Sequence, residues 1–501
     1  MAFLTSLLVL QDEDKWETAW EEWSPELWNE LGTAPPPQEL LPASHLVKVT
    51  SADSTSLTPE SPFIIPQDAV GPGEFCPLVE ATPLTPLGRD VRHFSWDISE
   101  TNITYEVGDA LGIWSTNQTD RVSDFLDWYG LKLDDIIEVE DIAESREPPL
   151  PSVMTAKQLF CQCLDIFGRP KRQFYEVLSI LATDEKEKAQ LTHLLEKDGK
   201  GELRELIDDT KTYADLLQMF PSADMPLEYM IDFIPVIKPR LYSIASAPEM
   251  YPDHIHLCVV EEDWENKAGE QKRGQSTWFL RNTMPGLQWG EVQGQHSAQP
   301  TTPYTSGLEN WQNVGNLDDS PAFIPRDQAA HIPVRVNSAV VHPPPRDVPL
   351  VVVGLGTGIA PFRSFFQQRQ IWREEGKDIG DVLLYFGARY EATEFLYGNE
   401  MYDWVDDGLI TEMKCAFSRD QEEKVYAQHR IVEDPAMFYD YMVTRGGYFY
   451  LCGPAGNMPA QVEAACVEAI SKGAPGGMPE DEAQQMVTDW KINGRYNVEV
   501  W

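Results

Sequence analysis

A run of glycines lies between an apolar segment and a segment with helical periodicity. After Val351–Val353 the chain reads Gly354-Leu-Gly356-Thr-Gly358, and a helix is expected from Pro361. Backbone NH groups of such a turn can approach an anionic pyrophosphate, which the helix N-terminus also favours. The third glycine follows the second by two residues, whereas the usual dinucleotide fingerprint has three. The run therefore predicts a nucleotide-binding turn or, alternatively, only a tight strand-to-helix connection.

A second group of residues brings positive charge into an otherwise acidic chain. Ser418 and Arg419 are followed by Lys424, Tyr426 and Gln428. Two cations with hydroxyl and amide groups beside them can clamp a phosphate, such as the 2′-phosphate that distinguishes NADPH from NADH. The alternative is a basic surface patch that pairs with neighbouring carboxylates. Such a patch does not need the two hydroxyls, which favours the phosphate interpretation.

Two further segments have the residue types that suit a flavin. Arg240 can meet a pyrophosphate, Tyr242 can stack on a flat heterocycle, and Ser243 can hydrogen-bond to its edge. Downstream, Gly274–Thr277 offers NH groups to an anion at an expected helix start. A strand whose tyrosine packs in a core and whose arginine meets a carboxylate would have a similar sequence, so this alternative stays open.

The elements that must position these residues follow two patterns. Alternating apolar residues predict strands at 91–98, 110–114, 240–245 and 255–260. Helical spacing of Leu159, Leu164, Phe174 and Leu178 predicts a helical insert at about 155–235. From residue 349 onwards, strand patterns at 349–353 and 382–386 alternate with a helical pattern at 361–372. We therefore expect an all-β unit interrupted by helices, followed by a parallel sheet with crossover helices.

The N-terminal region and one long internal segment have a different character. Four tryptophans at near-helical spacing over residues 12–32 predict an amphipathic helix that covers a hydrophobic surface. The Ser-, Thr- and Pro-rich stretch that follows, to about Glu80, predicts an extended tether. Residues 285–345 have little periodicity and predict a long loop of functional or disordered character.

Composition narrows the class of protein. The 501 residues include 81 acidic and 39 basic side chains, a formal charge of −42, which argues against nucleic-acid binding. Seven cysteines without CxxC or His-paired spacing predict a reducing compartment and no metal site. The apolar start Phe3–Leu10 is too short to span a bilayer and lacks a basic flank. We expect an intracellular, soluble protein without a membrane span, cytoplasmic or mitochondrial.

Taken in order, the motifs resemble those of the diflavin reductases. The shared features are Arg-x-Tyr-Ser at Arg240, Gly-x-x-Ser/Thr at Gly274, Gly-x-Gly-Thr-Gly-Ile-Ala-Pro-Phe-Arg at Gly354–Arg363, Phe386-Gly-Ala-Arg389, Ser418-Arg419 with Lys424-x-Tyr426-x-Gln428, Tyr450-Leu-Cys452-Gly453 and the terminal Trp501. The family includes NADPH-cytochrome P450 reductase, the sulfite reductase flavoprotein and the C-terminal part of pyruvate:NADP oxidoreductase. The resemblance covers residues 75–501.

The resemblance implies a ferredoxin-NADP reductase-like architecture. Residues 75–285 would form an FAD-binding β-barrel with an α-helical connecting insert at about 155–235. Residues 286–345 would form a long loop and a return to the barrel, and 346–501 an α/β doubly wound NADPH-binding domain. Residues 1–74 would be a Trp-rich helix and linker, the remnant of a flavodoxin-like domain, so FMN is not expected in this chain.

The same resemblance assigns roles to individual residues. FAD would be held by Arg240, Tyr242, Ser243 and Ser246, by backbone from Cys258 to Val260, and by Gly274, Gln275, Ser276 and Thr277. NADPH would be held by Gly356, Thr357 and Arg389, and its 2′-phosphate by Ser418, Arg419, Lys424, Tyr426 and Gln428. Ser243, Cys452 and Glu499 would lie at the reacting nicotinamide, with Trp501 stacked on the flavin. The acid is glutamate where the family more often has aspartate, which shifts the carboxylate by about 1.5 Å.

The implied function is an NADPH-dependent FAD oxidoreductase that passes electrons one at a time to an acceptor in trans. The acceptor would be a flavodoxin-like protein, an iron-sulfur protein or the rest of a larger enzyme. Two alternatives remain: a C-terminal fragment of pyruvate:NADP oxidoreductase or of another diflavin enzyme, and a structural subunit that keeps the fold without turnover. Among family members the motifs are most similar to the pyruvate:NADP oxidoreductase tail.

Overall fold

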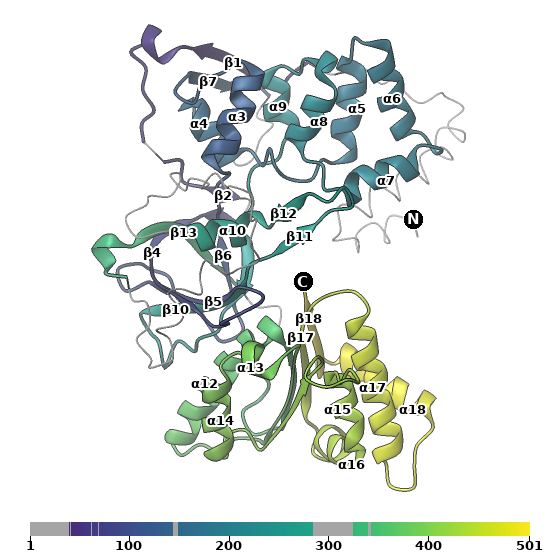
Figure 1. The fold of residues 1–501 in the computed structure, drawn as a ribbon. Coiled ribbons are helices and arrows are strands. Elements are labelled where there is room, and N and C mark those ends of the chain that lie inside the picture. Colours follow the sequence, from purple (N-terminus) through teal and green to yellow (C-terminus); the bar gives the residue numbers. More distant parts are fainter. Residues whose placement is uncertain are drawn as a thin grey trace.

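The computed structural model describes residues 40, 42–61, 63–68, 70–143, 149–283, 324–338 and 342–501. Figure 1 shows a helical part, an antiparallel sheet and a parallel sheet that follow one another from top to bottom. We call these parts the helical, antiparallel and parallel lobes. The Trp-rich segment 12–32 and most of the long loop lie outside the described residues, so the expectations for them stay predictions.

The antiparallel lobe is built on a six-stranded sheet. Its strand order is β10-β5-β4-β13-β6-β9, and every neighbouring pair is antiparallel. A bridge between Ile244 and Leu257 brings the two edges of this sheet together. Trp96, Leu111 and Val334 are completely buried on its inner side. The strands are β4 (Glu74–Pro83), β5 (Val91–Asp97), β6 (Ala110–Ile113), β9 (Arg240–Ser243), β10 (His254–Val260) and β13 (Ala330–Asn337).

Smaller elements surround this sheet. Helix α10 packs against it through Trp278, Phe279 and Leu280, and the hairpin of β11 and β12 precedes that helix. The strand predictions at 91–98, 110–114, 240–245 and 255–260 are confirmed to within a few residues. The bounds are α10 (Gln275–Asn282), β11 (Asp263–Glu265), β12 (Gln271–Arg273), β2 (Gln67–Asp68), β3 (Gly71–Pro72), η1 (Ala52–Ser54) and η4 (Arg326–Gln328).

The helical lobe confirms the predicted helices and is larger than expected. Helix α3 begins at Thr119, well before residue 155, and buries Val122, Phe125 and Leu126. This i, i+3, i+4 pattern is a helical signal that the sequence reasoning missed. The helices of the lobe are α3 (Thr119–Tyr129), α4 (Ala156–Gln158), η2 (Leu159–Cys163), α5 (Arg172–Leu181), α6 (Glu185–Leu195), α7 (Lys200–Asp208), α8 (Tyr213–Met219), η3 (Pro221–Ala223) and α9 (Leu227–Phe233).

Part of the predicted tether is a strand of this lobe, which corrects that expectation. Strand β1 (His45–Thr50) pairs with β7 (Ile136–Asp141), which also pairs with β8 (Val153–Thr155). His45 is buried, and its Nδ1 lies 2.6 Å from Asp232 Oδ1 at the end of α9. A six-residue strand has too little periodicity to be recognised within a Ser-, Thr- and Pro-rich stretch. The residues with which it pairs lie about 90 positions later in the chain, so no local pattern indicates the pairing.

The parallel lobe confirms the predicted alternation of strand and helix. Its five strands are all parallel in the order β16-β15-β14-β17-β18. Along β14, Leu350 and Val352 join one buried cluster and Val351 and Val353 join another. Both faces of the sheet are therefore covered, with α12 and α14 on one side and α15 and α17 on the other (Figure 1). After β14 the chain adds β15 and β16 on one side of that strand, and later β17 and β18 on the other. In parallel sheets, such a switch in strand order leaves a crevice at the carboxyl ends of the two central strands, here β14 and β17.

The strands of the parallel lobe are β14 (Leu350–Leu355), β15 (Val382–Ala388), β16 (Glu412–Phe417), β17 (Tyr448–Gly453) and β18 (Tyr496–Val500). The helices are η5 (Gly356–Ile359), α12 (Ala360–Glu374), α13 (Glu391–Glu394), α14 (Gly398–Asp406), α15 (Ala427–Glu433), α16 (Pro435–Tyr439), η6 (Asp440–Thr444), α17 (Met458–Gly473) and α18 (Glu480–Ile492).

One buried cluster continues from the parallel lobe into the antiparallel lobe. Ala245, Ala247 and Cys258 of the antiparallel lobe pack in the same cluster as Ile359 and Phe362 of the parallel lobe. Such shared apolar packing resists relative motion of the two lobes. The crevice at β14 and β17 is therefore held in a fixed position against the end of β9.

A histidine pair is buried where the two lobes meet. His93 on β5 lies 2.9 Å from the hydroxyl of Tyr397, which belongs to the parallel lobe, and its ring contacts that of His256. Burial, and secondly the charge of Arg363, lowers the pKa of His93 to about 3. His93 is therefore neutral in the folded protein at neutral pH.

This burial predicts acid sensitivity of the fold. Because the pKa of His93 is lower in the folded protein than the ordinary value of about 6.5, the unfolded chain binds the proton more readily below pH 6.5. Folding stability should fall between pH 6.5 and 4, by up to about 1.4 kcal/mol per pH unit from this residue. In thermal unfolding scans across this pH range, the His93→Gln variant should lose less stability on acidification than the parent protein. His331→Gln, a substitution at an exposed histidine, is the control. If His93→Gln lost as much stability as the parent, the buried neutral state of His93 would be contradicted.

Candidate functional site

The glycine run forms the turn between β14 and α12, as the sequence predicts. Gly356 has a φ of +57°, which favours glycine, and Thr357 follows it in η5. A Cβ atom on Gly358 would lie 2.1 Å from the carbonyl oxygen of Cys452 on β17. The third glycine therefore lets the turn pack against β17. The unusual spacing of the glycines is thus explained by packing against β17. The NH groups of the turn are still able to bind a phosphate.

Ser243, Cys452 and Glu499 meet in space although they are far apart in sequence. The Ser243 hydroxyl donates to Glu499 Oε1 at 2.7 Å, and the Cys452 thiol lies 3.5 Å from Oε2 of the same carboxylate. Ser243 ends β9 of the antiparallel lobe, while Cys452 and Glu499 are register partners on β17 and β18. One carboxylate thus joins the two lobes at the crevice.

The electrostatics of this group keep the thiol protonated. Cys452 is 1% exposed, and burial together with the neighbouring Glu499 carboxylate raises its pKa well above the ordinary value. A neutral thiol can donate to Glu499, and Ser243 donates to the other oxygen. The group therefore offers a carboxylate whose two oxygens are oriented by two donors from different lobes.

Trp501 lies beside this group. Its backbone carbonyl accepts a hydrogen bond from Ala455 NH at 2.9 Å, while its indole is 52% exposed. The main chain of the last residue is therefore fixed and its large apolar side chain is open to solvent.

The residues expected at a flavin are distributed between the surface and the interior. Arg240 is exposed, and Tyr242 lies beside Ser276, with burial raising the pKa of the phenol. Cys258 and Val260 are buried on β10. Ser246 is completely buried, where its hydroxyl lies 3.0 Å from the Tyr105 hydroxyl and accepts from His256 NH at 3.1 Å. The Ser246 hydroxyl is thus used inside the protein.

Residues 274–277 form the expected turn at the start of α10. A Cβ on Gly274 would lie 2.8 Å from Thr277 Oγ1, so a side chain at this position would require Thr277 to move. The Thr277 hydroxyl accepts from Glu262 NH at 3.2 Å and ties the helix to the preceding hairpin. Gln275 extends toward the helical lobe, where its amide donates to Asn117 at 2.8 Å and to Asp165 at 3.1 Å.

Asn117 and Asp165 are site residues that the sequence reasoning missed. Asn117 also donates to the carbonyl oxygens of Phe160 and Leu164, both at 2.8 Å. Burial raises the pKa of Asp165, while the charge of Arg240 and the hydrogen bond from Gln275 oppose that rise. The Asp165 carboxyl of the helical lobe therefore interacts electrostatically with Arg240. No local motif marks these two residues, because their partners come from elements that are distant in sequence.

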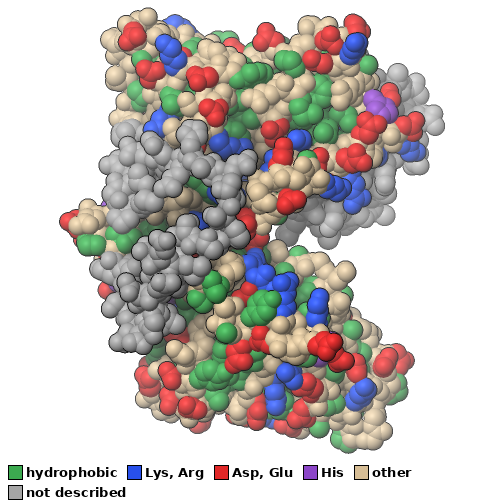
Figure 2. Space-filling view, in the orientation of Figure 1, with side chains coloured by type: hydrophobic (Ala, Val, Ile, Leu, Met, Phe, Trp, Pro, Cys, Tyr) green, Lys and Arg blue, Asp and Glu red, His purple; other side chains and the backbone are tan. Residues whose placement is uncertain are grey.

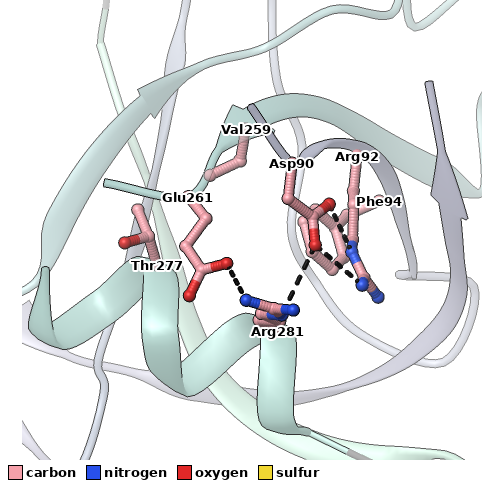
Figure 3. A pocket seen from close by; sticks show the side chains of 7 residues that line it. All are labelled: Asp90, Arg92, Phe94, Val259, Glu261, Thr277 and Arg281. Carbon is pink, nitrogen blue, oxygen red and sulfur yellow. Dashed lines mark hydrogen bonds and ion pairs between the residues drawn. The ribbon is translucent and has the colours of Figure 1, made fainter. Parts of the chain in front are cut away.

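A small cavity next to α10 is closed by ion pairs (Figure 3). Asp90 accepts a hydrogen bond from Arg92 at 2.9 Å and forms an ion pair with Arg281 at 3.4 Å, and Arg281 also pairs with Glu261. Its volume of about 10 Å³ is near the lower limit for one water molecule. These contacts anchor α10 to β5 and β10, and the cavity is too small for an organic ligand.

The basic residues lie at the ends of β15 and β16. Ser418 NH donates to the Ala388 carbonyl at 3.0 Å, and Arg419 NH donates to the Arg389 carbonyl at 2.8 Å, so the two loops lie side by side. The guanidinium of Arg389 pairs with Glu394, a residue that the sequence reasoning did not single out. Figure 2 shows basic side chains on the parallel lobe where it faces the hollow between the lobes.

Within the described part of the chain, Arg419 and Lys424 form no ion pair with a carboxylate. Both side chains are exposed, as is Tyr426. Gln428 points toward α17, where its amide lies 3.4 Å from Gln461. The alternative of a patch paired with Asp and Glu is therefore not supported for Arg419 and Lys424.

Among the described residues, no helix has the length and apolar character needed to cross a bilayer. No cluster of three or more His, Cys, Asp or Glu side chains in the same residues could hold a metal ion.

Comparison with known proteins connects both sheet lobes to flavoprotein domains. Residues 76–279 match the FAD binding domain, and residues 352–463 match the oxidoreductase NAD-binding domain. The chain is 33% identical to the mitochondrial pyruvate dehydrogenase [NADP(+)] of Euglena gracilis over 98% of its own length and 24% of that protein. It is 32% identical to the sulfite reductase [NADPH] flavoprotein component of Saccharomyces cerevisiae, over 82% of this chain and 36% of that protein.

A third relative has the same two-domain region. The chain is 29% identical to the NADPH–cytochrome P450 reductase of Drosophila melanogaster, over 83% of this chain and 56% of that protein. It therefore spans between about a quarter and just over half of the length of these relatives. With its FAD-binding and NAD-binding domains in this order, the chain belongs to the diflavin reductase family.

Proposed function

We propose that the chain is an NADPH-dependent FAD oxidoreductase that delivers electrons singly to an acceptor protein. The observation that carries the proposal is the Ser243–Glu499–Cys452 group, which joins the two lobes at the crevice. Relatives named as NADPH-dependent reductases support it. The acceptor is proposed to be a flavodoxin-like protein, an iron-sulfur protein or the rest of a larger enzyme.

The fine architecture is part of this proposal. We propose that the antiparallel lobe, residues 75–285 with the return strand β13, acts as an FAD-binding barrel interrupted by the helical insert. The bridge between its edge strands supports closure of the sheet. Residues 346–501 are proposed as a doubly wound NADPH-binding domain, which the two covered sheet faces support. The Trp-rich segment 12–32, which precedes β1, is proposed to retain the end of a flavodoxin-like domain.

The residues present fit the two nucleotides. At the turns of Gly274 and Gly356, no side chain of the glycine covers the backbone NH groups. A pyrophosphate needs such accessible NH groups. Arg240 and the uncompensated Arg419 and Lys424 supply positive charge at separate places on an acidic protein. When bound, NADPH supplies a hydride and FAD converts its electron pair into single electrons.

Each residue of the reacting group has a proposed task. Ser243 and Cys452 donate to the two oxygens of Glu499 and so hold the carboxylate in one orientation. There it would stabilise positive charge on a bound nicotinamide ring. The indole of Trp501 would cover a bound flavin and exclude water from it. Arg240 would hold the flavin pyrophosphate, Tyr242 would stack on the ring, and the NH groups of Gly274–Thr277 would complete the site. Ser246 contributes by fixing the strand that carries Ser243.

The first test concerns Glu499. Glu499→Gln keeps the side-chain shape but removes the negative charge, so NADPH-driven reduction of ferricyanide should fall about tenfold to a hundredfold in kcat with a small change in KM. Val498→Ala, an exposed neighbour on the same strand, serves as the control. A rate equal to that of the parent would remove Glu499 from the proposed site, and a parent protein without flavin or reductase activity would favour the structural-subunit alternative.

The second test concerns coenzyme choice. Loss of a charge-assisted hydrogen bond costs about 1.5–3 kcal/mol, so Arg419→Ala and Lys424→Ala should each raise KM for NADPH by about tenfold to a hundredfold. KM for NADH should change less than about twofold, because NADH has no 2′-phosphate for these residues to bind. Lys472→Ala, an exposed lysine of α17 that pairs with Glu468, controls for general charge loss. Parallel changes in both KM values would refute the 2′-phosphate assignment.

A further inference from the structure

The segment that follows Ser243 is held by the parallel lobe at every second residue. Ser243 donates to Glu499, the Ala245 carbonyl accepts from Arg363 Nη1 at 2.7 Å, and Ala247 NH donates to Gln367 Oε1 at 3.0 Å. Between them, Ser246 points the other way into the antiparallel lobe. The hydroxyl of Ser246 therefore faces the antiparallel lobe, while the backbone groups of Ala245 and Ala247 contact the parallel lobe.

Arg363 and Gln367 come from one helix, α12, four residues apart and thus on the same face. They are 5% and 1% exposed. The same helix begins directly after the glycine turn Gly356–Ile359. A single rigid element therefore extends from the proposed nucleotide turn to the backbone that carries Ser243.

Two further contacts hold the guanidinium of Arg363 in place. Its Nε and Nη2 donate to the Glu400 carboxylate at 2.6 and 2.8 Å, and its guanidinium lies over the ring of Tyr397 with its carbon 4.8 Å from the ring centroid. Tyr397 has a φ of +56°, an uncommon and strained conformation for a bulky residue, and its hydroxyl reaches His93. These contacts leave the guanidinium little freedom of movement.

We infer that Arg363 and Gln367 are positioning residues for transfer between the nucleotide and the flavin. By holding Ala245 and Ala247, they fix Ser243 at the distance from which it orients Glu499. Neither residue contacts the Ser243–Glu499–Cys452 group in its own right. The inference rests on the proposed function, since it assigns these two residues to the geometry of the same site.

The experiment compares two buried arginines of the same helix in the full chain. Arg363→Lys removes the guanidinium group that bonds to both Glu400 and the Ala245 carbonyl. Gln367→Met has a similar side-chain volume but removes the oxygen that accepts from Ala247 NH. Arg369→Lys is the matched control, because Arg369 is also buried on α12 but donates to Gly380 and Val348 within the parallel lobe. Thermal unfolding reports the general loss of stability for each variant.

Two kinetic measurements separate positioning from binding. In stopped-flow reduction by NADPH, Arg363→Lys and Gln367→Met should reduce flavin at least about tenfold more slowly and show a larger isotope effect with C4-deuterated NADPH, since small misplacement slows transfer steeply. The Kd for adenosine 2′,5′-bisphosphate, which lacks the nicotinamide, should stay within about twofold of the parent value. Arg369→Lys should keep the parent rate and isotope effect.

A third measurement does not depend on activity. Hydrogen–deuterium exchange of the peptide that contains 244–251 should be at least about tenfold faster in Gln367→Met than in the parent or Arg369→Lys, because Ala247 NH loses its acceptor. Parent-like exchange or a parent-like reduction rate in Gln367→Met would overturn the inference, as would an equal loss of rate in Arg369→Lys. If the parent itself is not reduced by NADPH, the proposed function fails, and the exchange result alone decides whether α12 holds the segment.

Discussion

The relative position of the two sheet lobes depends on the contacts of one buried group, the guanidinium of Arg363. Transfer of an ion out of water costs several kcal/mol unless charge pairing and hydrogen bonds compensate it. Glu400 supplies the charge from the parallel lobe, and the Ala245 carbonyl supplies a further acceptor from the antiparallel lobe. Separation of the lobes would leave the guanidinium without that acceptor. The apolar cluster around Ala245 and Phe362 excludes the water that would otherwise replace it.

A fixed relation between the lobes matters because each contributes half of the reacting group. Cys452 and Glu499 are neighbours by strand pairing, so the parallel lobe alone determines their separation. Ser243 reaches the same carboxylate from β9, an edge strand of the other sheet. Its hydrogen bond is therefore sensitive to any sliding of one lobe over the other. Gly358 has a related role, since its close approach to Cys452 sets the distance between the nucleotide turn and β17.

Local sequence patterns were sufficient to predict the elements that carry the site. The apolar run before Gly354 and the helical pattern after Pro361 predict β14 and α12 because neighbouring residues alone determine them. The pairing of β17 with β18 and the role of Asp165 depend on residues that come together only in the folded chain. Similarly, nothing local marks β1, whose partner strand begins about 90 residues later. The grouping of Ser243, Cys452 and Glu499 was predicted through the family resemblance, and their spacing alone would not have predicted it.

The glutamate at position 499 is explained by the distance between the lobes. Its Oε1 lies 2.7 Å from the Ser243 hydroxyl while its backbone is held in register with Cys452. An aspartate on the same backbone would withdraw the carboxylate by about 1.5 Å, one bond length, and the contact with Ser243 would exceed the hydrogen-bonding range. The lobes cannot approach to restore it, because Gln367 and Arg363 already hold Ala247 and Ala245 at hydrogen-bonding distance. The longer side chain is thus matched to the separation that α12 imposes, and the two features depend on each other.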